Sequence, residues 1–381
     1  MSDRPIVHSI PQGTLSQALS GGRIPGLDFL RALAVMLVIA DHSGIPALGP
    51  VLLTNGSLGV EIFFVLSGFL ITWILLAELR ASGTIGLKDF YQRRAARLLP
   101  AFYLYVAAGL LILWVVHKPI PWAAVASSSL YVLNYYQAFT GATSHFLSHC
   151  WSLAVEEQFY FLWPFLLIFL VKRQMSLKAA IVTLVALIWT YRAVALLCFN
   201  ASDEYLYRAL ETRADHLLVG ALLAVMLQEP LWQKRWEAAA RQTWIAPVLI
   251  AVLIASTSAH GQMTYKYALG FALEPILIAA LLPTVVLWAQ RSAGWTRVLT
   301  APLVTTVGQA SYGIYLFHPF VVHPARHAVE RLTGSFALGF AFSVAVLTVV
   351  AVLSYRFIES PLRQRWQPEH RASPVQQVLT G

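Results

Sequence analysis

The first apolar segment, 27–40, carries an arginine near its start and ends directly before an aspartate and a histidine. Arg31 and His42 are 11 residues apart, so in a helix both side chains lie on one face, roughly 16 Å apart along the axis. Charged groups inside a bilayer are costly and usually functional, and an imidazole can move a proton. This spacing favours a long anionic cofactor whose reactive end reaches His42. The alternative is an arginine that extends to the head groups and a histidine that only caps the helix.

Four carboxylates are candidates to act with His42. Asp41 points about 100° away from His42 on a straight helix, so we expect no direct hydrogen bond between them. Glu61 lies near the outer end of the next apolar segment and is a candidate to orient a histidine on a neighbouring helix. Glu156 and Glu157 open a further apolar segment, where the helix dipole offsets part of the cost of burial. A solvated helix start is the alternative for this pair.

Three arginines, Arg93, Arg94 and Arg97, lie within five residues just before the third apolar segment. Arg93 and Arg97 are one helical turn apart and share a face. Arginine forks match phosphate oxygens, so this density predicts an anion with several phosphates, such as an adenosine 3′-phosphate joined to a pyrophosphate. The alternative is the ordinary positive charge on the cytoplasmic side of a membrane protein.

Candidate contacts for a second substrate lie near the predicted outer face. Arg213 and Asp215 precede the sixth apolar segment and could pair there. His318 sits in an apolar run just before a proline, where a buried structural histidine is an equally good interpretation. Trp151 and other aromatic residues of the outer loops could stack on a sugar or form an interfacial belt.

Two histidine pairs have the spacing of helical metal ligands, but neither has the rest of a metal motif. His145 and His149 lack the intervening glutamate of a zinc protease helix. His323 and His327 flank a proline in a predicted outer loop. We therefore predict no metal site, and the sequence also lacks a Walker loop, a dinucleotide fingerprint and a nucleophile elbow.

The chain that must position these residues is 381 residues long, 58% hydrophobic and only 12% charged, with a mean hydropathy of +0.64. Soluble domains carry about 25% charged residues, so the composition indicates an all-α polytopic membrane protein. Ten apolar segments are near the length that a bilayer requires, and in the second of them Ser67 and Gly68 permit close helix packing. The segments are 27–43, 58–77, 99–117, 152–171, 179–199, 215–228, 244–259, 268–289, 302–322 and 335–355. A further stretch, 119–140, is a candidate interfacial or re-entrant helix.

Basic residues set the expected orientation. With ten spans and both termini in the cytoplasm, most of the 27 lysines and arginines fall in cytoplasmic segments, as the positive-inside rule requires. The net charge of +9 then reflects contacts with anionic lipid head groups and gives no reason to expect nucleic acid. We expect a cytoplasmic tail over 1–24 without a cleaved signal peptide, a membrane domain over 25–362 and a cytoplasmic tail over 363–381.

Seven stretches together resemble the acyltransferase-3 family of integral membrane O-acyltransferases, in family order across nearly the whole chain. They are Gly26–Arg31 with Asp41–His42, Gly59–Leu70, Phe90–Pro100, His149–Tyr160, Thr212–Leu223, Ser311–Pro319 and Arg356–Pro361. Each is weak alone, and seven in order are a specific signal. The resemblance implies a ten-helix membrane core that transfers an acyl group, commonly acetyl, from coenzyme A to a hydroxyl. It also implies a sugar as acceptor, in a surface polysaccharide, peptidoglycan, a lipid-linked glycan or a secreted small molecule.

The resemblance also implies roles for single residues. His42 matches the essential histidine of the first helix, Arg31 matches its partner arginine, and the three clustered arginines match the basic motif associated with the donor. Glu156 and Glu157 match the carboxylate pair of the Ser-Leu-Ser-Val-Glu-Glu motif. The chain departs from that motif at Ala154, where the family usually has serine, so a role for that hydroxyl is in doubt. Some relatives add a soluble SGNH domain, and we expect this chain to act as the membrane core without one.

These features predict a multi-pass acyl-CoA-dependent O-acyltransferase of the bacterial inner membrane, with acetyl-CoA as co-substrate and a sugar or glycan as acceptor. The donor phosphates would bind Arg31 and the clustered arginines, and His42 would act as general base or as a transient acyl carrier. Glu61, Glu156 or Glu157 would orient and charge-balance the imidazole. The alternative is a proton-coupled secondary transporter of a sugar-like or antibiotic substrate, and a scaffold for polysaccharide assembly is a third reading. Acceptor identity, acyl length and oligomeric state stay open.

Overall fold

The computed structural model describes residues 14–20, 24–44, 55–143, 145–291 and 293–365. These residues are mostly helical, and none of them forms a strand. The first helices are α1 (Thr14–Ser20), α2 (Pro25–His42), α3 (Gly56–Ser82), α4 (Leu87–Val115), α5 (Trp122–Ser129), α6 (Leu133–Thr140), α7 (Trp151–Lys172), α8 (Leu177–Phe199), α9 (Asp203–Arg208) and α10 (Leu210–Met226). They are followed by α11 (Pro230–Ala239), α12 (Ile245–Ser258), α13 (Met263–Tyr265), α14 (Phe271–Arg291), α15 (Ala293–Leu299), α16 (Pro302–Gln309), α17 (Ser311–Thr333), α18 (Phe336–Ser354) and α19 (Ser360–Arg365). A 3-10 turn, η2 (Ser148–Cys150), precedes α7, and two π-helical segments, η3 (Lys266–Gly270) and η4 (Tyr355–Glu359), precede α14 and α19.

Six helices of the described residues are long and apolar enough to cross a membrane. They are Gly56–Ser82, Leu87–Val115, Ser148–Lys172, Leu177–Phe199, Met263–Ala289 and Phe336–Leu362. A pair bent by 107°, Asp203–Met226 with Pro230–Ala239, would make a seventh. The all-α, multi-pass character is thereby confirmed, whereas the expected number of ten crossings is not. α2 has 18 residues, but three of them, Asp28, Arg31 and Asp41, are charged. α12 is apolar but has only 14 residues. Neither helix is therefore among the six.

α4 is longer than the sequence pattern indicated. The predicted segment 99–117 is the second half of a 29-residue helix that begins at Leu87 and contains Pro100. Membrane helices tolerate an internal proline because neighbouring groups can satisfy the freed backbone atoms. The arginine cluster therefore lies inside a continuous helix and has fixed directions along it. The following stretch, 119–140, forms the short helices α5 and α6, which are too short to cross a bilayer.

The predicted segment 302–322 is two helices, and our expectation of a single one was wrong. α16 and α17 meet at Ala310, and α17 continues to Thr333. The break accompanies a close backbone contact, since a Cβ added to Gly308 would lie 2.1 Å from the carbonyl oxygen of Asp28 on α2. We had predicted an outer loop for His323 and His327. Both residues lie inside α17 instead.

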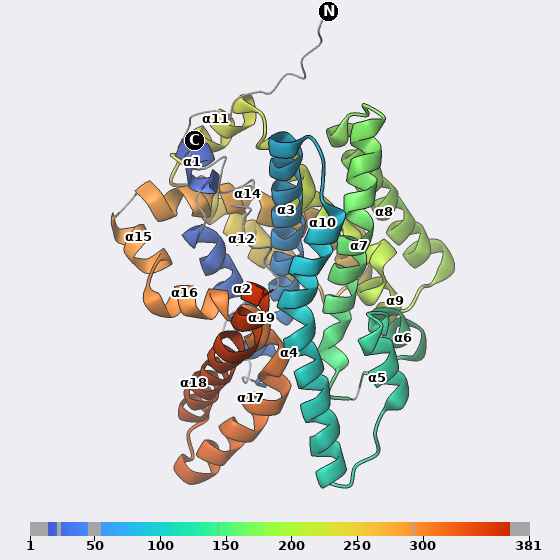
Figure 1. Cartoon of the computed structure of the whole chain (residues 1–381), viewed down its shortest axis with the longest axis vertical. Coiled ribbons are helices and arrows are strands. Elements are labelled where there is room, and N and C mark those ends of the chain that lie inside the picture. The colour runs from blue at the N-terminus through green and yellow to red at the C-terminus, as the bar shows by residue number, and fades with distance from the viewer. Residues whose placement is uncertain (1–13, 21–23, 45–54, 144, 292, 366–381) are drawn as a thin grey trace, which may run out of the picture.

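α3 is the central helix of the bundle. It is 67% buried over its most apolar stretch, against 28% for α4, and it runs beside α10 and α7 through the middle of Figure 1. Glycines allow these close crossings. A Cβ on Gly68 would lie 1.8 Å from the carbonyl oxygen of Leu217, and one on Gly220 would lie 2.1 Å from that of Val65. Small residues at such crossings let backbones approach, so α3 and α10 are joined with no side chain between them.

Part of the expected N-terminal tail is a packed helix. Leu15 of α1 is fully buried, and its backbone N–H donates to Glu237 of α11 over 2.9 Å. α1 also packs on α14, at the end of the molecule where α11 lies (Figure 1). Residues 1–13 and 21–23 of the expected tail lie outside the described residues, as do residues 366–381 of the expected C-terminal tail.

Candidate functional site

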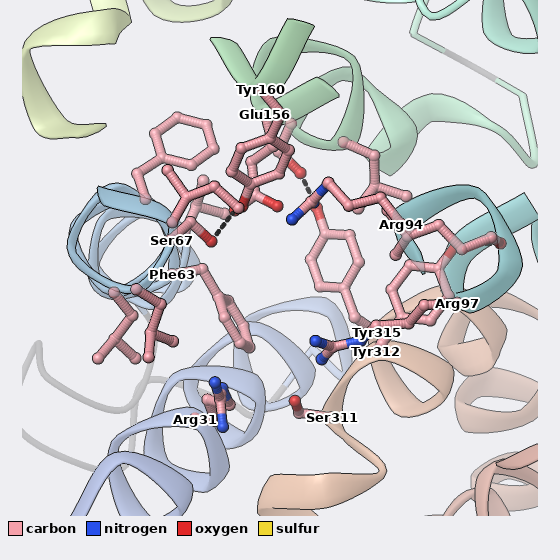
Figure 2. Close-up of a pocket in the computed structure, with 18 of the residues that line it drawn as sticks. Arg31, Phe63, Ser67, Arg94, Arg97, Glu156, Tyr160, Ser311, Tyr312 and Tyr315 are labelled. Atoms are coloured by element: carbon pink, nitrogen blue, oxygen red, sulfur yellow. Dashed lines mark hydrogen bonds between the residues drawn. The ribbon is translucent and has the colours of Figure 1, made fainter. Parts of the chain in front are cut away.

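Five helices, α2, α3, α4, α7 and α17, enclose a cavity of about 190 Å³ (Figure 2). All five carry predicted sequence motifs, which belong to the first, second, third, fourth and ninth apolar segments. The residues that line the cavity are Arg31, Val60, Phe63, Phe64, Leu66, Ser67, Leu70, Ile71, Ile74, Arg94, Arg97, Leu98, Ser152, Leu153, Glu156, Tyr160, Ser311, Tyr312 and Tyr315. We refer to it as the arginine pocket.

Three predicted arginines meet in this pocket from two helices. Arg31 of α2 and Arg97 of α4 face each other from opposite sides in Figure 2, with Arg94 above them. Arg31 pairs with Asp28 over 3.1 Å, and Arg94 pairs with Glu157 over 3.0 Å. Because neither carboxylate lines the cavity, each holds its arginine from behind and leaves the guanidinium edge toward the cavity. Three cations in one cavity suit an anion with more than one phosphate.

Glu156 is the carboxylate of the pocket. Ser67 on α3 donates a hydrogen bond of 2.9 Å to its Oε1, across the cavity wall shown in Figure 2. Ser67 therefore does more than allow helix packing, which is the role its sequence context indicated. Tyr160 is one turn further along α7. Its ring lies under the guanidinium of Arg94, with 3.4 Å between Arg94 Cζ and the ring centre. The α7 motif thus supplies both an acidic group and an aromatic support for the cation.

The opposite wall is apolar and belongs to α3. It is built from Val60, Phe63, Phe64, Leu66, Leu70, Ile71 and Ile74. The pocket therefore combines guanidinium groups from α2 and α4 with a hydrocarbon wall from α3. An amphipathic ligand, with phosphates at one side and a long arm of low charge at the other, matches such a cavity.

Tyr315 closes one end of the pocket. Its hydroxyl lies 2.6 Å from Ser152 Oγ and donates to the carbonyl oxygen of His149 over 2.8 Å. Its ring contacts Phe63 edge to face, with 6.2 Å between centroids. Tyr315 thus links α17 to the start of α7 and to α3. Neither Tyr315 nor Ser152 was a predicted site residue, because their contacts join helices that are far apart in sequence.

Three imidazoles continue from this closed end to the end of α2. His149 contacts Tyr315 with 5.5 Å between ring centroids, and His318 lies 4.9 Å from His149. His42 lies 4.9 Å from His318 and is half exposed, with 47% of its side-chain surface accessible. His42 and His318 were predicted site residues, and the structure brings them together. His149 entered the sequence analysis as a metal candidate and as the first residue of the stretch His149–Tyr160, and its contact with His318 across the fold had no sequence signal.

Asp41 is close to His42 without a hydrogen bond to it. The closest ion-pair contact joins His42 Nδ1 and Asp41 Oδ2 over 4.0 Å. His42 Nδ1 instead donates to the Val38 carbonyl oxygen over 2.9 Å. This geometry confirms the expectation that two neighbouring side chains on a straight helix point apart.

A second group of predicted residues is buried behind the pocket. Arg213 lies 3.8 Å from Glu61, and Asp215 pairs with Arg192 over 2.8 Å, with all four side chains fully buried. The sequence suggested that Arg213 and Asp215 could pair with each other. They do not, because Asp215 turns toward Arg192 on α8. Phe64 separates this group from the arginine pocket, since it lines the pocket and lies under the Arg213 guanidinium at 5.7 Å.

The remaining predicted residues lie outside the pocket. Arg93 is half exposed and approaches Glu78 at 3.6 Å. Glu157 faces Arg94 from outside the cavity, and Trp151 packs against Phe64 with 6.2 Å between ring centroids. Within the ranges that the structure describes, no three His, Cys, Asp or Glu side chains are arranged to hold a metal ion.

Comparison with known proteins places this arrangement in a family. A family profile described as an acyltransferase domain matches residues 24–356. A protein predicted to be an O-acetyltransferase in Staphylococcus aureus is 32% identical over 383 residues, covering 91% of this chain and 59% of that protein. The peptidoglycan O-acetyltransferase OatA of Listeria monocytogenes is 32% identical over 363 residues, covering 90% of this chain and 56% of that protein.

The chain therefore spans a little over half the length of these curated relatives. No solved structure matches it. The matched region includes every helix that encloses the arginine pocket and carries the imidazoles. The protein is a member of the acyltransferase-3 family of membrane acyltransferases.

Proposed function

We propose that this protein transfers an acyl group, acetyl in the first instance, from acyl-CoA to a hydroxyl group of a glycan. The observation that carries the proposal is the arginine pocket, in which guanidinium groups from α2 and α4 oppose the apolar wall of α3. Coenzyme A has this division itself, with phosphates at one end and the pantetheine arm and thioester at the other. Membership of an acyltransferase family supports the same reaction class.

In this proposal the donor phosphates contact Arg31, Arg94 and Arg97, and the pantetheine arm follows the apolar residues of α3. α17 begins at Ser311, and its first residues line the pocket. The positive end of that helix dipole therefore adds to the attraction for phosphate. Arg93 stands outside the pocket, so we propose a weaker, peripheral contribution for it.

His42 is the proposed general base. Because its Nδ1 donates to a backbone carbonyl, its Nε2 carries the lone pair in the neutral ring and can take the proton of an acceptor hydroxyl. The transient acyl-imidazole is the second route. Glu61 and Glu157 are engaged by Arg213 and Arg94, so neither supports the expected role of orienting this imidazole. Asp41 remains the nearest carboxylate, and Glu156 belongs to the donor side.

We propose that the acceptor approaches the exposed side of His42. Peptidoglycan is the acceptor named for the relative in Listeria monocytogenes, and a sugar hydroxyl of a cell-wall or surface glycan is the class we propose here. Arg213 and Asp215 are fully buried, so contact with a glycan would require the bundle to open around them. His318, whose ring contacts that of His42, and Trp151 are also buried and stay candidate contacts in this proposal.

The proposed topology has ten crossings of a bacterial plasma membrane and both termini in the cytoplasm. Its support is the distribution of lysine and arginine, which favours that side for the ends of the chain. Donor and acceptor would then reach the protein from opposite sides, and only the acyl group would cross. A proton-coupled transporter, the rival from sequence, has no support from the family match.

The first test uses membranes that contain the wild-type protein or His42→Ala, supplied with radiolabelled acetyl-CoA. We expect label in a glycan fraction with the wild type and a loss of roughly 10²–10⁴ in rate with His42→Ala, because a general base contributes that much. Lipid, glycan and small-molecule fractions are counted separately, so the labelled fraction names the acceptor class. Near-normal turnover of a folded His42→Ala protein would rule out His42 as base.

A further inference from the structure

His318 is buried directly behind His42, on the neighbouring helix α17. It is 1% exposed, and its ring meets that of His42 edge to face, with 4.9 Å between centroids and 65° between planes. One imidazole therefore faces the outside and the second stands behind it. The donor pocket does not use His318, and the resemblance to the family assigned it no role.

Backbone carbonyls fix the tautomer of both rings. His42 Nδ1 lies 2.9 Å from the carbonyl oxygen of Val38, and His318 Nδ1 lies 2.6 Å from that of Tyr315. A carbonyl oxygen can only accept, so in both neutral rings Nδ1 carries the hydrogen and Nε2 carries the lone pair. Each Nε2 is then on the side of its ring that points away from its own helix.

Among the residues that the structure describes, His318 Nε2 is a buried acceptor without a hydrogen-bond partner. Burying a polar atom unpaired is unfavourable, and such atoms in folded proteins usually have a functional explanation. Within the described ranges, no carboxylate takes the position that an aspartate has beside the histidine of a catalytic triad, and Asp41 Oδ2 is 4.0 Å from His42 Nδ1. The group in ring contact with His42 on the neighbouring helix is a second neutral imidazole.

We propose that His318 is the positioning partner of His42, and that its Nε2 lone pair stabilises the imidazolium formed during acyl transfer. This inference rests on the proposed function. In the step concerned, the acceptor O–H bond breaks and its proton moves to His42 Nε2, while the hydroxyl oxygen bonds to the thioester carbonyl carbon. The C–S bond then breaks, and the leaving thiolate takes the proton from the imidazolium. His318 carries no proton in this cycle and acts only on the charged intermediate form of His42.

Other ionisable groups face the pair and enter the design of the test. They are Asp41 on α2, His149 of η2, Tyr315 and His323 on α17, and Tyr105 of α4 behind His149. Asp41 is the carboxylate among them, so it is the competing source of stabilisation for an imidazolium.

The experiment compares kcat/KM as a function of pH for the wild type, His318→Gln and His318→Leu, using acetyl-CoA and the labelled glycan fraction. The glutamine amide oxygen can accept near the position of Nε2, whereas leucine offers similar volume and no acceptor. We expect His318→Leu to lower kcat by roughly 10–100-fold, as loss of an orienting partner does elsewhere. Its ascending pH limb should move to lower pH, because an imidazolium without the lone pair loses its proton more easily. His318→Gln should keep the wild-type limb and most of the activity.

Equal effects of leucine and glutamine with an unmoved pH limb would overturn the inference, and so would a limb that moves with Asp41→Asn but not with His318→Leu. His327→Gln, a half-exposed histidine further along α17, is the control for general effects on that helix. If His318→Leu does not fold, His318→Asn replaces it, because its shorter amide cannot reach the same position. An inactive wild-type protein would refute the proposed function and this inference together. An active wild type with an unaffected His318→Leu would sink this inference alone.

Discussion

At the scale of single residues, the arginines of the pocket are held in place by neighbouring groups. Arg94 is fixed by Glu157 on one side and by the ring of Tyr160 on the other. Glu359 of η4 attracts Arg97 from behind the cavity. A guanidinium that is already oriented loses less conformational freedom when it binds phosphate. The proposed anion would therefore meet guanidinium groups that are already oriented.

Substituting these arginines should separate donor binding from the chemical step. We expect Arg31→Ala and Arg97→Ala to raise KM for acetyl-CoA by roughly tenfold or more each, since a charge-assisted hydrogen bond contributes about 1.5–3 kcal/mol. Arg93→Ala should have a much smaller effect, because Arg93 points at Glu78 outside the pocket. Arg173→Ala, an exposed arginine at the end of α7, is the control. An unchanged KM in both pocket variants would show that the donor binds elsewhere.

Sequence reasoning located the arginines and His42 because their types and spacing are visible within one segment. It missed Ser67, His149 and Tyr315, whose partners lie on other helices. Ser67 meets Glu156 from 89 residues away, and the Tyr315 hydroxyl meets Ser152 from 163 residues away. Contacts of this kind depend on how helices are arranged, and no local pattern encodes them.

At the scale of elements, the crossing of α3 and α10 brings two helix backbones into direct contact. Both helices have a glycine at the crossing, and each glycine touches the backbone of the other helix. α3 carries Ser67 and the apolar wall of the pocket, and α10 carries Arg213. The crossing therefore fixes the pocket wall relative to the buried ion pairs.

A side chain at this crossing should destabilise the protein. Gly68→Ala places a Cβ 1.8 Å from the Leu217 carbonyl oxygen, and backbone atoms cannot move aside as a flexible side chain can. We expect a cost of about 1–3 kcal/mol, typical of overpacking, seen as a lower unfolding temperature in detergent. Gly261→Ala is the matched control, because nothing lies within 4 Å of its added Cβ. Equal unfolding temperatures for the two variants would contradict the close crossing.

Apolar length predicted the existence of the helices better than their ends. All ten segments coincide with helical residues, because a long run of hydrophobic residues has to be buried in the protein or face lipid. The division between α16 and α17 was not predictable, since it accompanies the contact of Gly308 with the backbone of Asp28, far away in sequence. The start of α4 at Leu87 was not predicted, because the charged arginine cluster precedes the apolar run by which the helix was recognised.

At the scale of the whole molecule, the two ends of the bundle differ. α1 and α11 lie at one end, and the turn between α17 and α18 lies at the other (Figure 1). Positive charge gathers in the segments that the proposed topology places in the cytoplasm, among them α11 with Lys234 and Arg235. In the proposed topology, the coenzyme would approach from the end where α1 and α11 lie.

Accessible cysteines can test that orientation. In a background with Cys150→Ser and Cys198→Ser, we expect Lys234→Cys to react with a membrane-impermeant maleimide only after the membrane is opened. Leu332→Cys, at a position 86% exposed near the α17–α18 turn, should react in intact cells. Both variants are also labelled in detergent, which controls for burial of the thiol. The opposite pattern would invert the proposed topology and place the arginine pocket on the wrong side for cytoplasmic coenzyme A.

Tyr315 has a consequence for the bilayer as an electrical insulator. A protein that hands an acyl group from one side of a membrane to the other must do so without conducting protons or ions down their gradients. The Tyr315 hydroxyl, bonded to Ser152 and to the His149 backbone, stands between the arginine pocket and the imidazoles. In the proposed reaction, an aromatic side chain fastened at this point would separate the water on the two sides, so the cell would keep its membrane voltage while the acyl group passes.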